Sequence, residues 1–166
     1  MPAHTDMPSF FGSLDTFSLG AGPIGLLTWR VTELGLAELS FGERRIPTQT
    51  VRHAVVEEVH DQLRSYFAGE LKAFDLPLAP MGTPFQMGCW EVLQTIDYGR
   101  VISYAEQARL LGNPAAVRAV ANANGANPIP IIIPCHRVIA SDGRLGGYGP
   151  GLNKKQWLLT HELNAI

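Results

Sequence analysis

The chain has 166 residues, of which 46% are hydrophobic, and it carries a formal net charge of −2. This length and apolar content suffice for one or two small domains with real cores, and the charge excludes a strongly basic nucleic-acid protein. Residues 1–80 carry six Lys and Arg against ten Asp and Glu, whereas residues 81–166 carry seven against five. The second half can contact a few phosphates, although chance asymmetry on a solvated surface explains the difference equally well.

No part of the chain predicts a membrane or export segment. Pro, Gly or charge interrupts every apolar run well before the roughly 18 residues that a membrane-spanning helix needs. The first residues lack the basic start and the apolar segment of a secretory signal. The two cysteines, Cys89 and Cys135, lie in different contexts, so we expect a reduced, cytoplasmic protein without a structural disulfide.

The first half predicts a small antiparallel sheet and one helix. A Gly-Pro turn signal precedes the first strand, the second strand shows apolar-polar alternation, and the helix has an apolar residue at every fourth position. In chain order, the predicted elements are a loosely held lead-in at 1–17, strands at 26–31 and 36–41, a helix at 50–67 and a short extended piece at 74–78.

The second half predicts helices separated by short turns. Residues 79–84 are the best linker, and Thr83 is expected to cap the first helix, with Pro84 at its first position. Ser103 and Glu106 form a capping-box pattern that begins the second helix. The last two helices are predicted at 113–123 and 153–163.

The second and third of these helices are joined by residues 111–113, and two short helices with so short a connection match a helix-turn-helix. The chain is therefore predicted to be α+β. A small N-terminal antiparallel sheet with a helix, residues 1–80, serves as a scaffold. A mostly helical C-terminal domain, residues 81–166, contains the helix-turn-helix.

The run at 131–138 is the most informative functional signal. Three consecutive isoleucines predict a buried strand, and Pro134 stops regular structure directly before Cys135 and His136. Because the backbone must turn there, the two side chains can share one pocket, directly or through a water. From these residues alone, an inert buried thiol and a reactive Cys-His pair both remain open.

Five motifs together resemble the O6-alkylguanine-DNA alkyltransferases. They are GTPFQMGCW (82–90), YGRVISY (98–104), GNPAAVRAV (112–120), NPIP (127–130) and IPCHRV (133–138). The resemblance covers essentially all of the second half in order and continues weakly into the first. It implies that an alkyl group passes irreversibly from O6-alkylguanine in double-stranded DNA to the protein's own cysteine, once per molecule.

The resemblance also implies the site residues. Those of the reaction are Cys135 as acceptor, His136 as its base, Glu162 as the carboxylate that orients the imidazole, and Asn127, which fastens the active-site turn. Those of substrate binding are Tyr104, Arg118, Pro130, Val138, Tyr148 and Gly149. Among these, Arg118 is expected to fill the stack that the extruded nucleotide leaves, and Tyr148 and Gly149 to form a wall of the base pocket.

No cofactor is expected, because the lesion itself is the alkyl donor. Residues 1–80 contain no cysteine to match the zinc ligands of some relatives, and the histidines show no ligand spacing, so no metal site is predicted. DNA is the expected partner of a monomeric protein. For Lys154 and Lys155 the sequence does not decide between a phosphate contact, a contact with the pocket and a solvated charge. For Arg137 it does not decide between an ion pair and a surface position.

Two other functions stay open at this point. A non-reactive damage-binding relative would lack the acceptor cysteine in this motif, and Cys135 is present. A cysteine hydrolase built on the Cys-His pair would turn over repeatedly.

Overall fold

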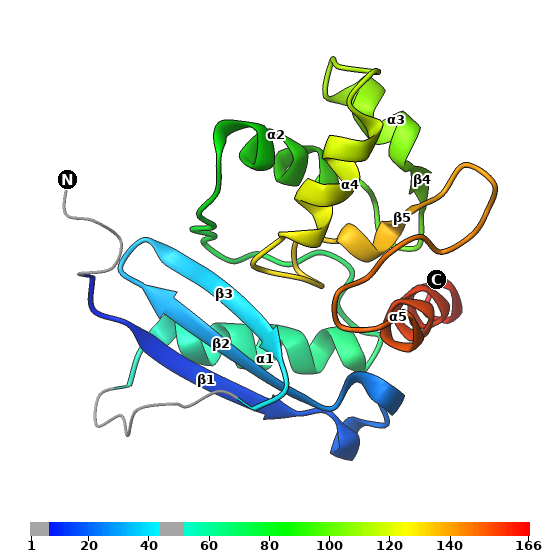
Figure 1. The fold of residues 1–166 in the computed structure, drawn as a ribbon. Helices are drawn as coiled ribbons and strands as arrows, with labels where there is room; N and C mark the ends of the chain where they lie inside the picture. Colours follow the sequence, from blue (N-terminus) through cyan, green and yellow to red (C-terminus); the bar gives the residue numbers. More distant parts are fainter. Residues whose placement is uncertain (1–6, 44–51) are drawn as a thin grey trace. The chain divides into compact units, whose positions relative to one another are not determined.

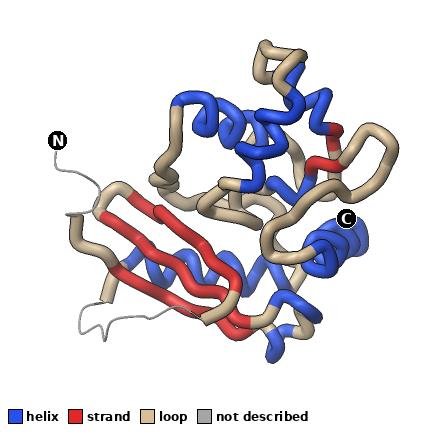
Figure 2. Tube along the Cα trace, in the orientation of Figure 1, coloured by secondary structure: helices blue, strands red, loops and turns tan. Residues whose placement is uncertain are grey.

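The computed structural model describes residues 7–43 and 52–166, and the chain divides into two compact units, Met1–Pro80 and Met81–Ile166 (Figure 1). Figure 2 shows strands concentrated in the first unit and helices in the second. The small antiparallel sheet followed by a mostly helical unit confirms the predicted α+β class. Within the described ranges, every helix is too short or too polar to cross a membrane.

The first unit is a three-stranded antiparallel sheet with one helix packed on it. Strands β1 (Phe10–Asp15), β2 (Leu26–Thr32) and β3 (Gly35–Phe41) lie in that order, and α1 (Ala54–Phe67) contacts all three. The buried apolar side of α1 packs on this sheet. The buried apolar residues of this layer include Leu27, Trp29, Val31, Leu39, Val59 and Leu63.

The two predicted strands and the helix of this unit are confirmed as β2, β3 and α1. Residues 50–51 of the predicted helix lie outside the described residues, and α1 begins at Ala54, with the His53 side chain accepting a hydrogen bond from the Val55 amide. The prediction of a loosely held lead-in at 1–17 is wrong for Phe10–Asp15, which pairs with β2 along its whole length as an edge strand.

The short extended piece at 74–78 is confirmed beside β3. Leu36 donates its amide hydrogen to the Pro77 carbonyl at 2.8 Å and accepts one from Ala79 at 2.7 Å, a parallel bridge. Gly35 makes this approach possible, because a Cβ built on it would lie 2.4 Å from the Pro77 carbonyl oxygen.

The second unit contains four α-helices and a two-residue parallel strand pair. Its elements are α2 (Pro84–Leu93), β4 (Ile102–Ser103), α3 (Tyr104–Leu110), α4 (Val117–Gly125), β5 (Val138–Ile139) and α5 (Leu152–Asn164). Thr83 caps α2, as its sequence predicts, and Gln86 completes a capping box that was not predicted. Ser103 accepts the Glu106 amide hydrogen at 3.0 Å and so begins α3, but the Glu106 carboxylate pairs with Arg109 and does not complete the predicted capping box.

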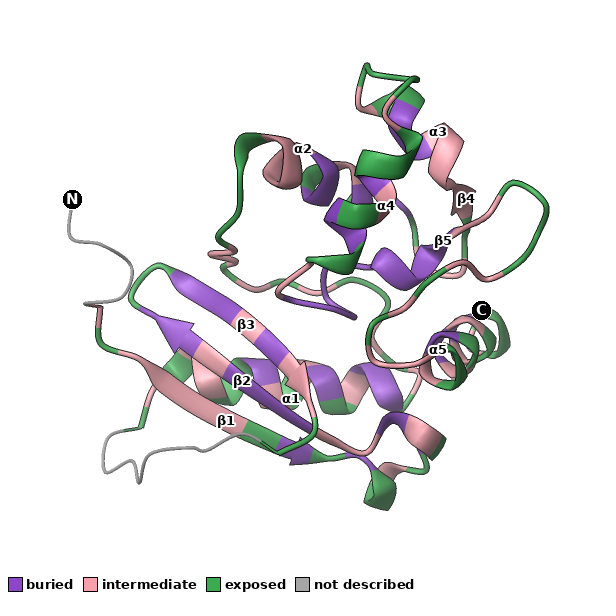
Figure 3. Ribbon diagram, in the orientation of Figure 1, coloured by how far each residue is buried: buried purple, intermediate pink, exposed green. Residues whose placement is uncertain are grey.

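Two predictions for this unit are wrong in detail. The third helix begins at Val117 and not at 113, because Ala116 donates to the Asn113 carbonyl at 3.0 Å and closes a turn there. The isoleucine triplet is buried, as expected, but it forms a turn and not a strand (Figure 3). The Ile133 amide donates to the Ile129 carbonyl at 2.9 Å across this turn, and Ile131 has a φ of 73°.

Candidate active site

Asn127 closes the turn that precedes the cysteine. Its Oδ1 accepts the Ile129 amide hydrogen at 2.9 Å, and its Nδ2 donates to the Ile133 carbonyl at 2.7 Å. The left-handed φ of Ile131 is unusual for a β-branched residue and costs about 1–3 kcal/mol. The two hydrogen bonds of Asn127 help to hold the turn in this strained form and bring the chain to Cys135 in a fixed direction.

Cys135 and His136 begin a single 3-10 turn, Cys135–Arg137, directly after the proline. The cysteine is 7% exposed, and burial raises the pKa of its thiol. A hydrogen bond from the Asn127 side chain and the positive charge of Lys155 act in the opposite direction. The surroundings of the sulfur therefore contain two groups that stabilise a thiolate.

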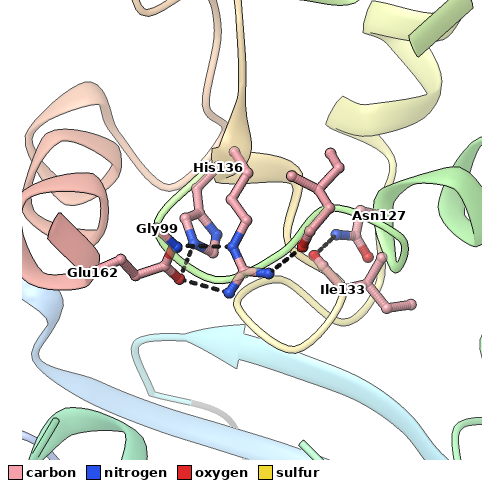
Figure 4. Close-up of polar contacts among 7 residues, drawn as sticks. Gly99, Asn127, Ile133, His136 and Glu162 are labelled. Carbon is pink, nitrogen blue, oxygen red and sulfur yellow. Dashed lines mark hydrogen bonds and ion pairs between the residues drawn. The ribbon is translucent and has the colours of Figure 1, made fainter. Parts of the chain in front are cut away.

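His136 is completely buried and is held by its Nε2 atom, which lies 2.8 Å from Glu162 Oε1 (Figure 4). Its Nδ1 atom has no hydrogen-bond partner among the described residues. With Nε2 donating to the carboxylate, Nδ1 carries the free lone pair, so the imidazole can accept a proton there. Burial lowers the pKa of His136, and although the hydrogen bond and the charge of Glu162 raise it, the charges of Arg137 and Lys155 lower it further, so the pKa stays below its usual value and the neutral ring is favoured.

Glu162, on α5, joins the histidine to a buried ion pair with Arg137. Arg137 donates from Nε and Nη2 to the two carboxylate oxygens, both at 2.9 Å, and from Nη1 to the Ile96 carbonyl at 2.7 Å. The Gly99 amide adds a bond of 3.3 Å to Glu162 (Figure 4). Burial alone raises the pKa of Glu162, but the hydrogen bonds and charges of His136 and Arg137 outweigh it and hold the pKa well below its usual range. Arg137, left open in the sequence, is thus part of an ion pair.

We expect the free energy of unfolding to fall as the solution is acidified from about pH 6.5 to about pH 3.5. Since the folded-state pKa of Glu162 lies below the unfolded value of about 4.3, its contribution is complete above that value, starts to decrease below it, and is lost as the pH falls to the folded-state pKa. The lowered pKa of His136 acts in the same direction, because the unfolded chain binds that proton first, near about pH 6.5. Urea titrations at several pH values measure the effect. A flat profile contradicts it, and Glu162→Gln should reduce the slope in the acid range.

Tyr104 and Tyr148 both lie within the electrostatic influence of Cys135. Burial raises the pKa of each phenol, and a thiolate at Cys135 raises both further. Tyr104, the first residue of α3, lies against the loop that follows β5, since a Cβ on Gly146 would be 2.7 Å from the Tyr104 hydroxyl. The structure therefore gathers Cys135, both tyrosines and the 145–149 loop in one place.

Gly146→Ala is expected to lower the free energy of unfolding by about 1–3 kcal/mol more than Gly143→Ala does. Both glycines have a left-handed φ, 72° and 87°, so an alanine pays a similar backbone strain at either position. Only the Cβ at position 146 meets Tyr104, while nothing lies within 4 Å of the one at Gly143. Urea denaturation of the two variants checks the difference. If both lose the same free energy of unfolding, the Tyr104 side chain can shift away from the new methyl group without destabilising the protein.

Lys155 is a site residue that the sequence left open. It is completely buried in the first turn of α5, and its Nζ donates to the carbonyls of Val138, Leu145 and Gly147, at 2.7 Å to the first and 3.2 Å to the last. The ammonium lies 5.7 Å from the centre of the Tyr104 ring, and burial lowers its pKa to about 8. The only hint in the sequence is a lysine at a helix start, where the helix dipole disfavours it.

The remaining predicted residues differ in exposure. Pro130 and Val138 are buried, Gly149 is exposed, and Arg118 is exposed in the first turn of α4. Within residues 7–43 and 52–166, no cluster of three or more His, Cys, Asp or Glu side chains could hold a metal ion.

Two family models match the chain. The DNA-binding domain of 6-O-methylguanine DNA methyltransferase matches residues 84–164, and the ribonuclease-like domain of the same protein matches residues 18–80. The methylated-DNA--protein-cysteine methyltransferases of Methanosarcina acetivorans and Methanosarcina barkeri are 45% and 48% identical, over 88% and 87% of this chain and 97% and 94% of theirs. The crystal structure of Mycobacterium tuberculosis OGT in complex with DNA is similar, with a TM-score of 0.81, 43% identity and 94% of each chain covered. The chain therefore belongs to the methylated-DNA–protein-cysteine methyltransferase family.

Proposed function

We propose that this protein repairs O6-alkylguanine in double-stranded DNA by one irreversible transfer of the alkyl group to Cys135. The observation that carries the proposal is the buried arrangement of Cys135, His136 and Glu162, in which Nε2 of the histidine lies 2.8 Å from the carboxylate and Nδ1 remains available. The names of the relatives and the DNA complex of the similar M. tuberculosis protein support it.

In the proposed reaction, the thiolate of Cys135 attacks the alkyl carbon in line with its bond to guanine O6. The S–C bond forms as the C–O6 bond breaks, and the guanine leaves with the electron pair. His136 Nδ1 accepts the thiol proton through a water, while Tyr104 assists the protonation of the departing base. Water cannot displace the thioether product, so each molecule acts once.

The DNA-binding part of the proposal uses α3, the turn that follows it and α4 as a helix-turn-helix. Val117, Arg118 and Ala119 are exposed at the start of α4, and the small side chains there allow close approach to a minor groove. Arg118 fills the stack as the nucleotide is extruded, a step that costs a few kcal/mol. The residues we propose to line the base pocket are Pro130, Val138, Tyr148 and Gly149.

A duplex oligonucleotide with one labelled O6-methylguanine, supplied in excess, tests the function. We expect one methyl group per chain, carried by the peptide that contains Cys135, together with restored guanine and no second round on fresh DNA. Binding without transfer would identify a damage-binding protein. Repeated release of a small product would identify a hydrolase, and either result contradicts the proposal.

We also propose that the protein acts as a monomer in the cytoplasm. Both cysteines, Cys89 and Cys135, are free thiols, a state that a reducing compartment maintains. Sedimentation of the free protein should give the mass of one chain, and a stable dimer would contradict this part.

A further inference from the structure

A closed pair of buried side-chain amides joins α3 to α4. Gln107 Nε2 donates to Asn124 Oδ1 at 2.8 Å, and Asn124 Nδ2 donates back to Gln107 Oε1 at 2.7 Å. The two residues are 0% and 7% exposed. Gln107 Nε2 also donates to the Cys89 carbonyl of α2 at 3.3 Å, so directional hydrogen bonds connect three helices inside the unit.

Stability alone does not explain this pair. The same three helices carry buried apolar residues close to the pair in sequence or bonded to it: Cys89, Ala108, Val120 and Ala123. Two apolar side chains of similar volume would fill the same space, and replacing both partners of a buried hydrogen bond is often nearly neutral. The amides add direction, because hydrogen bonds weaken steeply away from their preferred geometry. Single polar residues in apolar helix contacts specify register in the same way.

The two amides are placed to control the residues proposed to act on the target nucleotide. Gln107 lies one turn beyond Tyr104 on α3, and Asn124 lies in the last turn of α4, whose first turn carries Arg118. The N-terminus of α4 has no side-chain cap. Its C-terminal end is held by Asn124 and by a bond of 2.9 Å from the Trp90 indole to the Ala123 carbonyl. The hydrogen bonds at that distant end therefore contribute to the position of Arg118.

We infer that the Gln107–Asn124 pair is a positioning device, which sets where Arg118 stands relative to Tyr104 and so controls extrusion of the nucleotide. The inference rests on the proposed function, since only a protein that takes a base out of a duplex needs these two side chains in one register. Both amides are buried within the helices, so they act through Arg118 and Tyr104 and not by touching DNA.

The double variant Gln107→Met with Asn124→Leu tests the inference, because it removes both amides and leaves neither unpaired. Two substrates separate extrusion from chemistry: O6-methylguanine in a duplex, and free O6-benzylguanine base, which needs no extrusion. We expect the transfer rate from the duplex to fall by about tenfold to a hundredfold, as a small misplacement of a positioning group does. The rate with the free base should stay within about twofold. The swapped pair, Gln107→Asn with Asn124→Gln, keeps both amides and should retain more of the duplex rate.

A second measurement asks whether the pair acts through Arg118. Arg118→Ala should slow duplex repair strongly in the unchanged chain and only slightly in the double variant, where the side chain is already misplaced. The inference is overturned if Arg118→Ala slows duplex repair by the same factor in the original chain and in the double variant. It is also overturned if the double variant slows transfer from the duplex and from the free base equally. If the double variant does not fold, Asn124→Ser, whose hydroxyl cannot reach Gln107, replaces it in both measurements. If the wild-type protein accepts an alkyl group from neither substrate, the proposed function is refuted. If the double variant repairs the duplex as fast as the wild-type protein does, only this inference is refuted.

Discussion

A chain with Cys135→Ser is expected to accept no alkyl group from O6-methylguanine in a duplex, where the unchanged chain accepts one. A serine hydroxyl stays protonated near neutral pH, and the neighbouring His136 is too weak a base to ionise it without the rest of a hydrolase site. The thiol can ionise, because Asn127 and Lys155 stabilise its charged form. Mass spectrometry of the protein after incubation with excess DNA counts the transferred groups.

Cys89→Ala is the matched control, since Cys89 is the other free thiol of the chain. It is 0% exposed in α2, and burial raises its pKa, so we expect it to be inert. The control chain should keep the full capacity of one group per molecule. If Cys135→Ser still accepts an alkyl group, or if Cys89→Ala no longer does, Cys135 is not the acceptor. Unchanged DNA binding by Cys135→Ser would exclude misfolding as the cause of its inactivity.

Glu162→Ala is expected to lower the free energy of unfolding by about 3–5 kcal/mol, because it leaves the guanidinium of Arg137 buried without a counter-charge. Arg137 is 7% exposed and donates two hydrogen bonds to that carboxylate. Such a loss is a large share of the roughly 5–15 kcal/mol that stabilises an ordinary domain. Denaturant titration near neutral pH measures it, and a loss below about 1 kcal/mol would show that the pair is solvated.

Two further variants separate the structural part of this effect from the chemical part. Glu106→Ala removes an exposed ion pair, Glu106 with Arg109, and should cost less than about 1 kcal/mol. Glu162→Leu with Arg137→Met removes both buried charges and should recover part of the stability. Alkyl transfer should stay slow in that double variant, because His136 then lacks the carboxylate that orients its ring. Full recovery of transfer would limit Glu162 to a structural role.

The starts of α2 and α3 could be predicted from the sequence because their capping hydrogen bonds are local. The Thr83 box closes over three residues, and the Ser103 cap does the same, so each depends on little outside its own segment. The strands β2 and β3 were also predictable, since both are apolar runs bounded by glycine turn signals. Consecutive residues of both strands are buried, so their burial does not follow a strict alternation. The family motifs identified the Cys-His pair for the same reason, as the two residues are adjacent in the chain.

Two segments were predicted wrongly because contacts from residues outside each segment override its own propensity. Residues Phe10–Asp15 are mostly half-exposed and contain Gly12 and Ser13, so their strand form comes from pairing with β2 and not from their own pattern. The isoleucine triplet at 131–133 has strong strand propensity, yet the two hydrogen bonds of Asn127 and the flanking prolines impose a turn.

The arrangement around the cysteine was decided by the packing of the whole second unit. Arg137 meets Glu162 across 25 positions of sequence, and Lys155 reaches the Val138 carbonyl across 17. No periodic or local pattern in the sequence predicts either contact, because each forms only after β5, the loop that follows it and α5 have packed together. Residue identity therefore revealed which chemistry the chain carries, whereas the charges that tune the thiol and the imidazole depend on contacts that exist only in the folded protein.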